Sequence, residues 1–262
     1  MRRLCFTVDV DRDVNECVPG RVDATSLNEE EPRFTSSEKG VNIILDLLDE
    51  IGINATFFAE ARTMGNINVS FGNNEVAMHG FDHEDLTGEA TGVHLSNDRI
   101  REIIQDSVNI IRDKTGRTPQ GFRAPYMRTN ENILEIISEM GMFYDSSLYA
   151  EIGRVFLPYD IGNGMTEIPV PFRTDVNGKK MYSYMWSMHE GLRTPEEFIE
   201  MAEIVYDGIF VIGTHSWHIV ESRSGGMMDA EQMRNNIDNV RKIITSLLDK
   251  DFKAIKMIDS VR

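Results

Sequence analysis

The sequence contains few cysteines and no long apolar run. Only Cys5 and Cys17 occur among 262 residues, which is too few for a disulfide framework or a cysteine-based zinc site, so we expect both thiols to be reduced. No stretch approaches the roughly 18 consecutive apolar residues that a transmembrane helix needs. The chain passes from Met1-Arg2-Arg3 directly into an apolar segment with no signal-peptide pattern, and we therefore expect a cytoplasmic protein with no membrane partner.

Basic residues are also scarce relative to acidic ones. Lys and Arg number 27 against 43 for Asp and Glu, giving a formal net charge of −16. Such a charge repels a phosphate backbone, so nucleic acid is not expected as a partner. The 8 prolines are scattered and no fixed-period repeat occurs, so we expect residues 1–262 to form a single domain. Nothing in the sequence specifies whether the chain forms a homo-oligomer.

Short apolar segments alternate with segments of helical periodicity. The pattern predicts strands at 4–10, 55–58, 76–78, 121–123, 142–144, 167–170, 209–213 and 254–258, and helices at about 36–51, 96–113, 130–141, 195–206 and 229–248. This alternation is typical of a mostly parallel α/β architecture. About seven such units are enough to close into a (β/α) barrel, and a doubly wound open sheet is the alternative. Both topologies place ligand chemistry at the carboxyl ends of the strands.

The first predicted strand ends in two aspartates. In Thr7-Val8-Asp9-Val10-Asp11 the two carboxylates lie two residues apart, and a strand therefore turns them to the same side, about 7 Å apart along the chain. Like charges at this range disfavour each other's ionisation unless a cation is near. An acidic surface turn explains the same residues, so both interpretations stay open on this segment alone.

Two histidines follow the short strand at 76–78. His79 and His83 are four residues apart, a spacing that lets both imidazoles reach one divalent ion, and Glu84 or Asp85 can orient a ring from behind. With Asp11 they form a face of two histidines and one carboxylate that leaves positions open for water and substrate. We expect Zn²⁺ at this site, and Fe²⁺, Mn²⁺, Co²⁺ or Ni²⁺ fit the same ligands.

Two further strand ends carry polar residues. Arg123 precedes Ala124-Pro125-Tyr126, where a guanidinium that can pair with a carboxylate is followed by a proline-stiffened turn that can aim a backbone N–H. His215 directly follows an apolar strand. Taken singly, Arg123 is better explained by a structural ion pair and His215 by a polar strand end. If a metal site lies at the same edge of the sheet, however, Arg123 and His215 are better considered together with it.

The four motifs, in order, carry a resemblance. Thr-Val-Asp-Val-Asp, His-Gly-Phe-Asp-His, Arg-Ala-Pro-Tyr and Thr-His-Ser-Trp resemble the successive motifs of the NodB-homology polysaccharide deacetylases, metal-dependent N-deacetylases on a distorted, seven-stranded (β/α) barrel. The resemblance extends from Leu4 to about Ile258. It implies Asp9 as general base, His215 as general acid, Arg123 as the partner that holds Asp9, Tyr126 as a backbone oxyanion donor, and Asp11, His79 and His83 as the metal ligands.

Several positions depart from the usual family pattern. Val10 separates two aspartates that are adjacent in many members, which is similar to an intracellular branch with peptidoglycan-deacetylase-like, allantoinase-like and formamido-sugar deformylase-like proteins. Gly80 and Ser216 stand where a hydroxyl residue and a proline are usual. No segment matches the family's fourth motif, although Asp160, Arg173 and Trp186 lie in its interval. These departures leave the substrate open.

The residues predict amide hydrolysis. A divalent ion lowers the pKa of its bound water toward about 7 and polarises a carbonyl, while Asp9 accepts the water's proton and His215 protonates the departing amine. We expect a hydrolase that removes an acyl group, acetyl first of all, from an amino sugar or polysaccharide. An allantoinase-like or deformylase-like hydrolase of a small amide is the first alternative. A non-catalytic carbohydrate-binding descendant is the second, although such a protein needs neither the acid nor the base.

Aromatic and methionine residues gather at 181–188. We attribute Met181, Tyr184, Met185, Trp186 and Met188 to core packing in preference to a substrate groove, because Met commonly fills gaps in cores. For Trp217, stacking on a sugar ring and burial against the barrel are equally compatible with the sequence.

Overall fold

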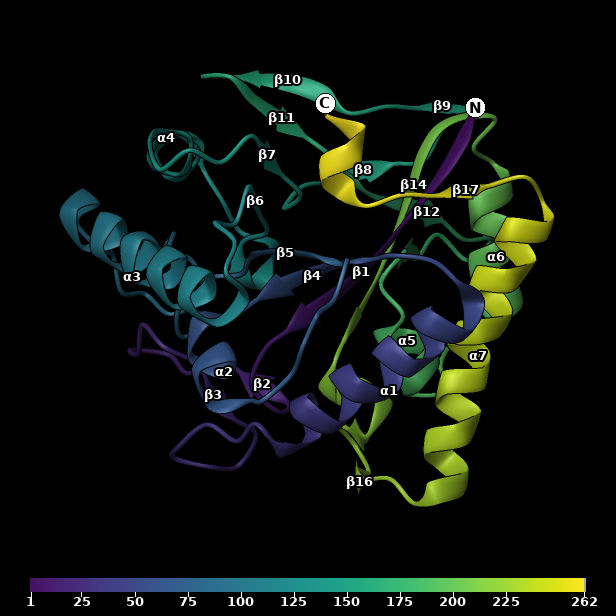
Figure 1. The fold of residues 1–262 in the computed structure, drawn as a ribbon, viewed down its shortest axis with the longest axis horizontal. Helices are drawn as coiled ribbons and strands as arrows, with labels where there is room; N and C mark the ends of the chain where they lie inside the picture. The colour runs from purple at the N-terminus through teal and green to yellow at the C-terminus, as the bar shows by residue number, and fades with distance from the viewer. Residues whose placement is uncertain (262) are drawn as a thin grey trace.

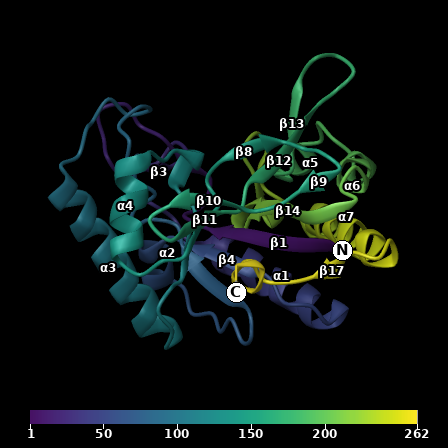
Figure 2. The same cartoon turned by 90° about the horizontal axis from the view of Figure 1, so that it is seen from above.

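The computed structural model describes residues 1–261, and a curled sheet of ten strands forms its centre (Figures 1 and 2). The strands pair in the order β10-β11-β7-β6-β5-β4-β1-β14-β9, with β17 on β1. All of these pairs are parallel except β10 with β11. The bounds are β1 Arg2–Val10, β4 Thr56–Ala59, β5 Glu75–Met78, β6 Gly121–Phe122, β7 Tyr144–Asp145, β9 Val155–Phe156, β10 Tyr159–Gly162, β11 Met165–Glu167, β14 Asp207–His215 and β17 Lys253–Ala254.

The two long strands at the middle of the sheet position the polar residues that follow. Strand β1 is buried on both faces from Leu4 to Val10, as its continuous apolar run requires in a parallel sheet. It pairs with β14 so that Asp9 lies opposite His215, and with β4 so that Asp9 lies opposite Phe58. The carboxyl ends of these strands therefore meet at one edge of the sheet.

Helices pack over the sheet through apolar stripes. The helices are α1 Thr35–Ile51, α2 Ala61–Asn66, α3 Asn97–Thr115, α4 Glu131–Glu139, α5 Trp186–His189, α6 Pro195–Glu203 and α7 Ala230–Asp249. In α1 the stripe includes Val41, Ile44 and Leu48, which are fully buried. Capping boxes begin α6 at Thr194 and α7 at Asp229, satisfying backbone N–H groups that a helix leaves open at its first turn.

Smaller elements lie around this framework. Three short 3₁₀ helices occur, η1 Pro125–Met127, η2 Trp217–Ile219 and η3 Met257–Ser260. Outside the main sheet, β8 (Tyr149–Glu151), β12 (Val170–Thr174) and β13 (Lys180–Tyr182) form a three-stranded sheet, while β2 (Asn15–Glu16) pairs with β3 (Thr25–Ser26) and β15 (Glu221–Ser222) pairs with β16 (Gly226–Met227).

The predicted α/β class and the distorted barrel are confirmed in outline. The sheet curls, and within residues 1–261 its outermost strands β10 and β9 do not pair with each other, so the barrel is not closed by hydrogen bonds. Two predicted strands are wrong in part. The segment 167–170 is divided between β11 and β12, which belong to different sheets. The segment 254–258 leaves the sheet after Ala254, because the N–H of Met257 donates to Thr56 Oγ1 at 2.9 Å and that of Ile258 to Glu75 at 3.1 Å.

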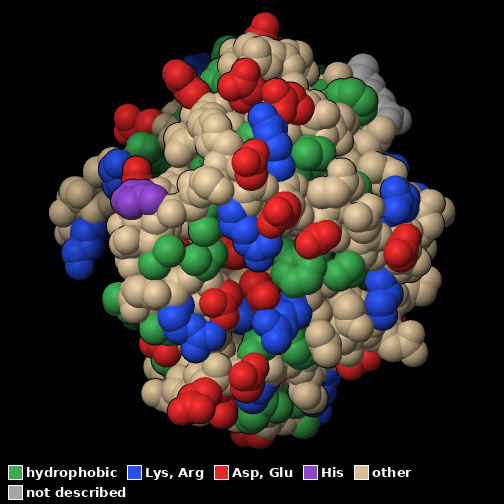
Figure 3. Space-filling model, turned by 90° about the vertical axis from the view of Figure 1, so that its left-hand side faces the viewer, with side chains coloured by type: hydrophobic (Ala, Val, Ile, Leu, Met, Phe, Trp, Pro, Cys, Tyr) green, Lys and Arg blue, Asp and Glu red, His purple; other side chains and the backbone are tan. Residues whose placement is uncertain are grey.

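The surface on the α3 side is a mosaic of charges. Figure 3 shows acidic and basic side chains interleaved over this face, and pairs such as Arg99 with Glu102 (2.9 Å) account for part of the pattern. Exposed pairs of this kind contribute little to stability, at most about 1 kcal/mol each. Across the described part of the chain, no helix combines the length and the apolar content that crossing a bilayer demands.

Helix α1 approaches the end of β14 very closely, and a glycine makes this possible. A Cβ built on Gly40 would lie 1.8 Å from the backbone oxygen of Ser216, the residue after His215. The neighbouring Ser37 hydroxyl meets the Ser216 hydroxyl at 2.5 Å. Gly40 thus lets α1 support the segment that carries His215.

We predict that Gly40→Ala lowers the free energy of unfolding by about 1–3 kcal/mol, because the added methyl group forces backbone to move. Urea denaturation measures the change. Gly65→Ala is the matched control, since Gly65 lies in α2 with nothing within 4 Å of an added Cβ, and it should cost nothing. Equal effects of the two substitutions would show that the contact with Ser216 is not the cause.

Candidate metal centre and its pocket

Asp11, His79 and His83 come together at the carboxyl end of the sheet. Asp11 follows β1, and the two histidines follow β5. One ligand atom from each lies within 4.8 Å of the others, and all three residues are buried. The ring centroids of His79 and His83 are 5.0 Å apart in an edge-to-face arrangement. The three predicted metal ligands therefore occupy one site in the structure.

The backbone and its hydrogen bonds orient the two imidazoles. His79 Nδ1 lies 2.8 Å from the carbonyl oxygen of Arg123, which directs its Nε2 away from β6. His83 adopts a left-handed backbone conformation with φ of 53°, uncommon for a residue with a side chain. Burial lowers the pKa of both histidines. Both rings are therefore neutral, the form in which imidazole binds a metal.

Asp11 has too few partners for a buried carboxylate. Asn15 Nδ2 donates to its Oδ2, which also lies 3.5 Å from His83 Nε2, whereas its Oδ1 has no hydrogen-bond partner. Burial, followed by the charges of Asp9 and Glu60, raises the pKa of Asp11 well above its usual value. A divalent cation would reverse both effects and satisfy the orphaned oxygen. The residues present thus fit a bound metal ion.

Both carboxylate oxygens of Asp9, in contrast, have hydrogen-bond partners, and one partner is a cation. Arg123 Nη1 donates to one carboxylate oxygen at 2.8 Å, and the Tyr184 hydroxyl donates to the other at 2.6 Å. Burial is the largest single influence and raises the pKa of Asp9, but the charge of Arg123, together with smaller contributions from His79, His215 and the Tyr184 hydrogen bond, lowers the pKa below its usual value. Arg123 is itself held by the carbonyl of Ser146 at 3.1 Å and by the Thr7 hydroxyl at 3.0 Å. Asp9 is therefore an ionised group with a fixed orientation.

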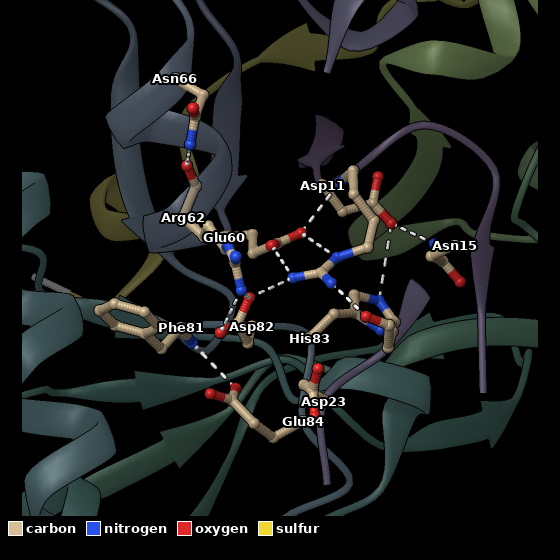
Figure 4. Close-up of polar contacts among 12 residues, drawn as sticks. Asp11, Asn15, Asp23, Glu60, Arg62, Asn66, Phe81, Asp82, His83 and Glu84 are labelled. Carbon is tan, nitrogen blue, oxygen red and sulfur yellow. Dashed lines mark hydrogen bonds and ion pairs between the residues drawn. The ribbon is translucent and has the colours of Figure 1, made fainter. Parts of the chain in front are cut away.

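A buried arginine links the two segments that carry the metal ligands. Arg12, next to Asp11, is fully buried and donates to Glu60, to the carbonyl of Ala24 and to Asp82 at 2.6 Å. Figure 4 shows Glu60, Asp82 and His83 close to Asp11. Glu60 is also fully buried and accepts the backbone N–H of Arg12 at 2.8 Å. Because Asp82 directly precedes His83, these contacts tie the end of β1 to the histidine loop.

The remaining predicted residues border the same cavity. A cavity of about 190 Å³ is lined by Asp9, His79, His83, Tyr126 and His215 among others. Tyr126 has a left-handed φ of 58° inside η1, and its ring meets that of His83 edge-on at 4.6 Å. His215 enters from β14, and burial, its largest influence, lowers its pKa to about 4. The structure thus brings all seven predicted site residues together, while their chemical roles stay predictions.

Other residues of this site were not singled out from the sequence as functional. Tyr184, which we attributed to core packing, is buried but binds Asp9, whereas Trp186 is 43% exposed and lines the cavity. Asn15 contacts Asp11. No local pattern identifies them, because each reaches the site from a loop or from a distant element.

Some residues considered from the sequence are placed elsewhere. The carboxylates of Glu84 and Asp85 accept backbone N–H groups, from Phe81 at 3.0 Å and from Thr91 at 2.9 Å, instead of orienting a histidine ring. Asp160 and Arg173 do not line the metal-site cavity. Met181, Met185 and Met188 are buried as core residues, as expected.

Comparison with known proteins points to one family. A model of the polysaccharide deacetylase family matches residues 35–144. A peptidoglycan deacetylase-like protein of Gibberella zeae is 26% identical over 161 residues, which cover 59% of this chain and 46% of that protein. The peptidoglycan deacetylase of Helicobacter pylori is 25% identical over 134 residues, 49% of this chain and 43% of that protein. Residues 35–144 therefore match the polysaccharide deacetylase family, in agreement with the resemblance of the four motifs. The matches to both curated relatives span less than half of the relative's length.

Solved structures share the fold of this chain. A putative polysaccharide deacetylase from Mycobacterium smegmatis superposes with a TM-score of 0.65 at 20% identity, over 99% of this chain and 88% of the other. An allantoinase gives a TM-score of 0.63 at 18% identity, over 99% and 89%. The family resemblance seen in the four motifs is thus confirmed, and so is the NodB-like fold.

We predict that Arg12→Met lowers the free energy of unfolding of the metal-free protein by about 3–5 kcal/mol, because Glu60 would be left buried without a counter-charge. Chemical denaturation in the presence of a chelator measures this loss. Glu60→Gln in the Arg12→Met background removes the unpaired charge and should recover part of the stability. The exposed Arg99→Met is the control, with an expected change within about 0.5 kcal/mol. A loss below about 1 kcal/mol for Arg12→Met would contradict the proposed link.

Proposed function

We propose that this chain is a metal-dependent hydrolase that removes an N-acyl group, acetyl first of all, from an amino sugar or its polymer. The observation that carries the proposal is the buried Asp11–His79–His83 cluster beside an ionised Asp9 and opposite His215. Family membership supports the reaction class, a hydrolase acting on non-peptide C–N bonds. The peptidoglycan deacetylase of Helicobacter pylori supports a sugar-polymer substrate.

Asp11, His79 and His83 would hold the cation, for which we propose Zn²⁺. Bound there, a divalent ion supplies an acidified water and a Lewis acid for the amide carbonyl. Asp9 is suited to accept a proton because Arg123 and Tyr184 keep it ionised and fixed. The backbone N–H of Tyr126 is our candidate for a further donor to the developing oxyanion.

His215 is the candidate acid for the departing amine. Burial lowers its pKa to about 4, so only roughly one molecule in a thousand carries the proton at pH 7 before substrate binds. Its Nδ1 has no hydrogen-bond partner among the described residues. Negative charge that develops on the substrate raises the proton affinity of a neighbouring imidazole. His215 therefore acts as an acid only once that charge has formed.

A small-amide hydrolase is the second candidate, and the size of the metal-site cavity favours it. About 190 Å³ suffices for an acyl group or a compact amide. A larger cavity of about 380 Å³ adjoins it through Asn15, Trp186 and His215. This added space favours a substrate with a bulky amine half, and hence the amino sugar.

We predict that Asp11→Ala and His83→Ala lose stoichiometric metal, whereas Asp9→Asn keeps the metal and loses turnover by about 10²–10⁴-fold, the usual contribution of a positioned base. Elemental analysis of purified protein measures the metal content, and circular dichroism checks that each variant is folded. Asn163→Ala, at an exposed turn away from the site, is the control. An Asp9→Asn protein as active as the parent would refute the base assignment.

A panel of N-acyl compounds tests the substrate class. We expect the metal-reconstituted protein to release acetate from N-acetylated amino sugars or their oligomers faster than formate from formamides or product from ureides. Enzymatic detection of acetate and formate, with chelator-treated protein as the blank, gives the rates. Turnover restricted to ureides or formamides would transfer the proposal to the small-amide class, and no turnover on any member would leave only a binding function.

A further inference from the structure

The second cavity lies on the side of His215 that faces away from the metal ligands. It measures about 380 Å³ and shares Asn15, Trp186 and His215 with the metal-site cavity. Trp186, Trp217 and Arg223 also line it, whereas the three metal ligands do not. His215 thus stands at the junction between the two spaces.

The position of His215 assigns the two halves of a substrate. An acid that protonates the departing nitrogen must lie on the amine side of the scissile bond. The acyl half would then occupy the smaller cavity beside the metal ligands, and the amine half would extend past His215 into the larger one. This assignment rests on the proposed function, in which His215 protonates the departing amine.

The hairpin that carries Arg223 is firmly held. Glu190 accepts the Arg223 backbone N–H at 2.7 Å, the Ser222 hydroxyl at 2.9 Å and the Ser224 hydroxyl at 2.6 Å. It also accepts His218 Nε2 at 2.8 Å. Glu190 is the one carboxylate that lines the cavity. Both of its oxygens already accept hydrogen bonds from these donors.

Most N–H groups of the Arg223 guanidinium have no hydrogen-bond partner within residues 1–261. Its one hydrogen bond within residues 1–261 goes to the backbone carbonyl of Asn15, and no carboxylate there lies within 4.0 Å of it. A guanidinium has five N–H groups in a planar fork that suits a carboxylate or phosphate. The net charge of −16 repels anions at long range, but salt screens that field beyond about 8 Å, whereas a bidentate contact acts directly.

We propose that the larger cavity binds the amine-bearing half of a substrate that carries a negatively charged substituent, a carboxylate or a phosphate, and that Arg223 recognises this group. Trp186, which is 43% exposed, offers an indole face for the sugar ring, whereas Trp217 is buried and stacks on His218. The alternative is that Arg223 only fastens the β15–β16 hairpin to strand β2 through Asn15. A fastening residue would affect all ligands of the cavity alike, whereas a recognition residue discriminates by charge.

Binding of amine products tests the subsite without turnover. Isothermal titration of the metal-loaded protein with glucosamine, glucosamine 6-phosphate and muramic acid separates neutral, phosphate and carboxylate substituents. Inorganic phosphate is titrated into the metal-loaded and the chelator-treated protein, and the difference in affinity measures what the metal contributes. We expect at least one of the two anionic amines to bind the parent roughly 10- to 100-fold more tightly than glucosamine, as a charge-assisted contact provides. Arg223→Gln should abolish this preference. Arg234→Gln, an exposed change on α7 outside the cavity, should retain it.

The outcomes are separable from those of the proposed function. Three results would overturn the subsite: the parent binds all three amines equally, it binds none of the three, or Arg223→Gln weakens the binding of all three to the same extent. A protein that prefers an anionic amine through Arg223 yet releases no acyl group would keep the subsite and refute the hydrolase. If both assays succeed, the tighter of the two anionic amines identifies whether the substituent is a phosphate or a carboxylate.

Discussion

Negative charge buried at the carboxyl ends of β1 and β4 is the constraint on which this site depends. Asp9, Asp11 and Glu60 are all withdrawn from water, and an isolated carboxylate in such surroundings is unfavourable. Arg123 compensates Asp9, and Arg12 compensates Glu60. No cationic side chain pairs with Asp11, whose described contacts are with Asn15 and His83. Of these three carboxylates, the one without a counter-charge therefore lies where two histidines can complete a coordination shell.

The groups that compensate this charge also make the site rigid. Arg123 contacts Ser146 and Thr7 as well as Asp9, and its guanidinium lies 4.0 Å from the centre of the Phe58 ring. Strands β1, β4 and β6 and the segment after β7 thus converge on one side chain. Such convergence places a proton acceptor in a single orientation before substrate arrives, which lowers the reorganisation that a reaction requires. The same contacts explain why so many polar residues lie deep in the fold.

The sequence predicted the parts of the site that depend on local spacing. Asp9 and Asp11 both belong to the site, as their positions at the end of β1 predict, and His79 and His83 lie close because they follow one strand end. Tyr184 and Arg12 escaped prediction, since their importance arises from partners far along the chain, Asp9 in one case and Glu60 and Asp82 in the other. The same physical reason explains the error at 254–258, where an apolar segment finds its hydrogen bonds in Thr56 and Glu75 and not in a strand.

The register between β1 and β14 places Asp9 directly opposite His215. Neighbouring strands lie about 4.8 Å apart, and side chains alternate between the two faces with a period of two. An insertion or deletion of one residue within either strand would turn one of the pair away from the other. Loops that carry no site residue can therefore vary in length during evolution, whereas the interiors of β1 and β14 tolerate a change in length only if Asp9 and His215 still face each other.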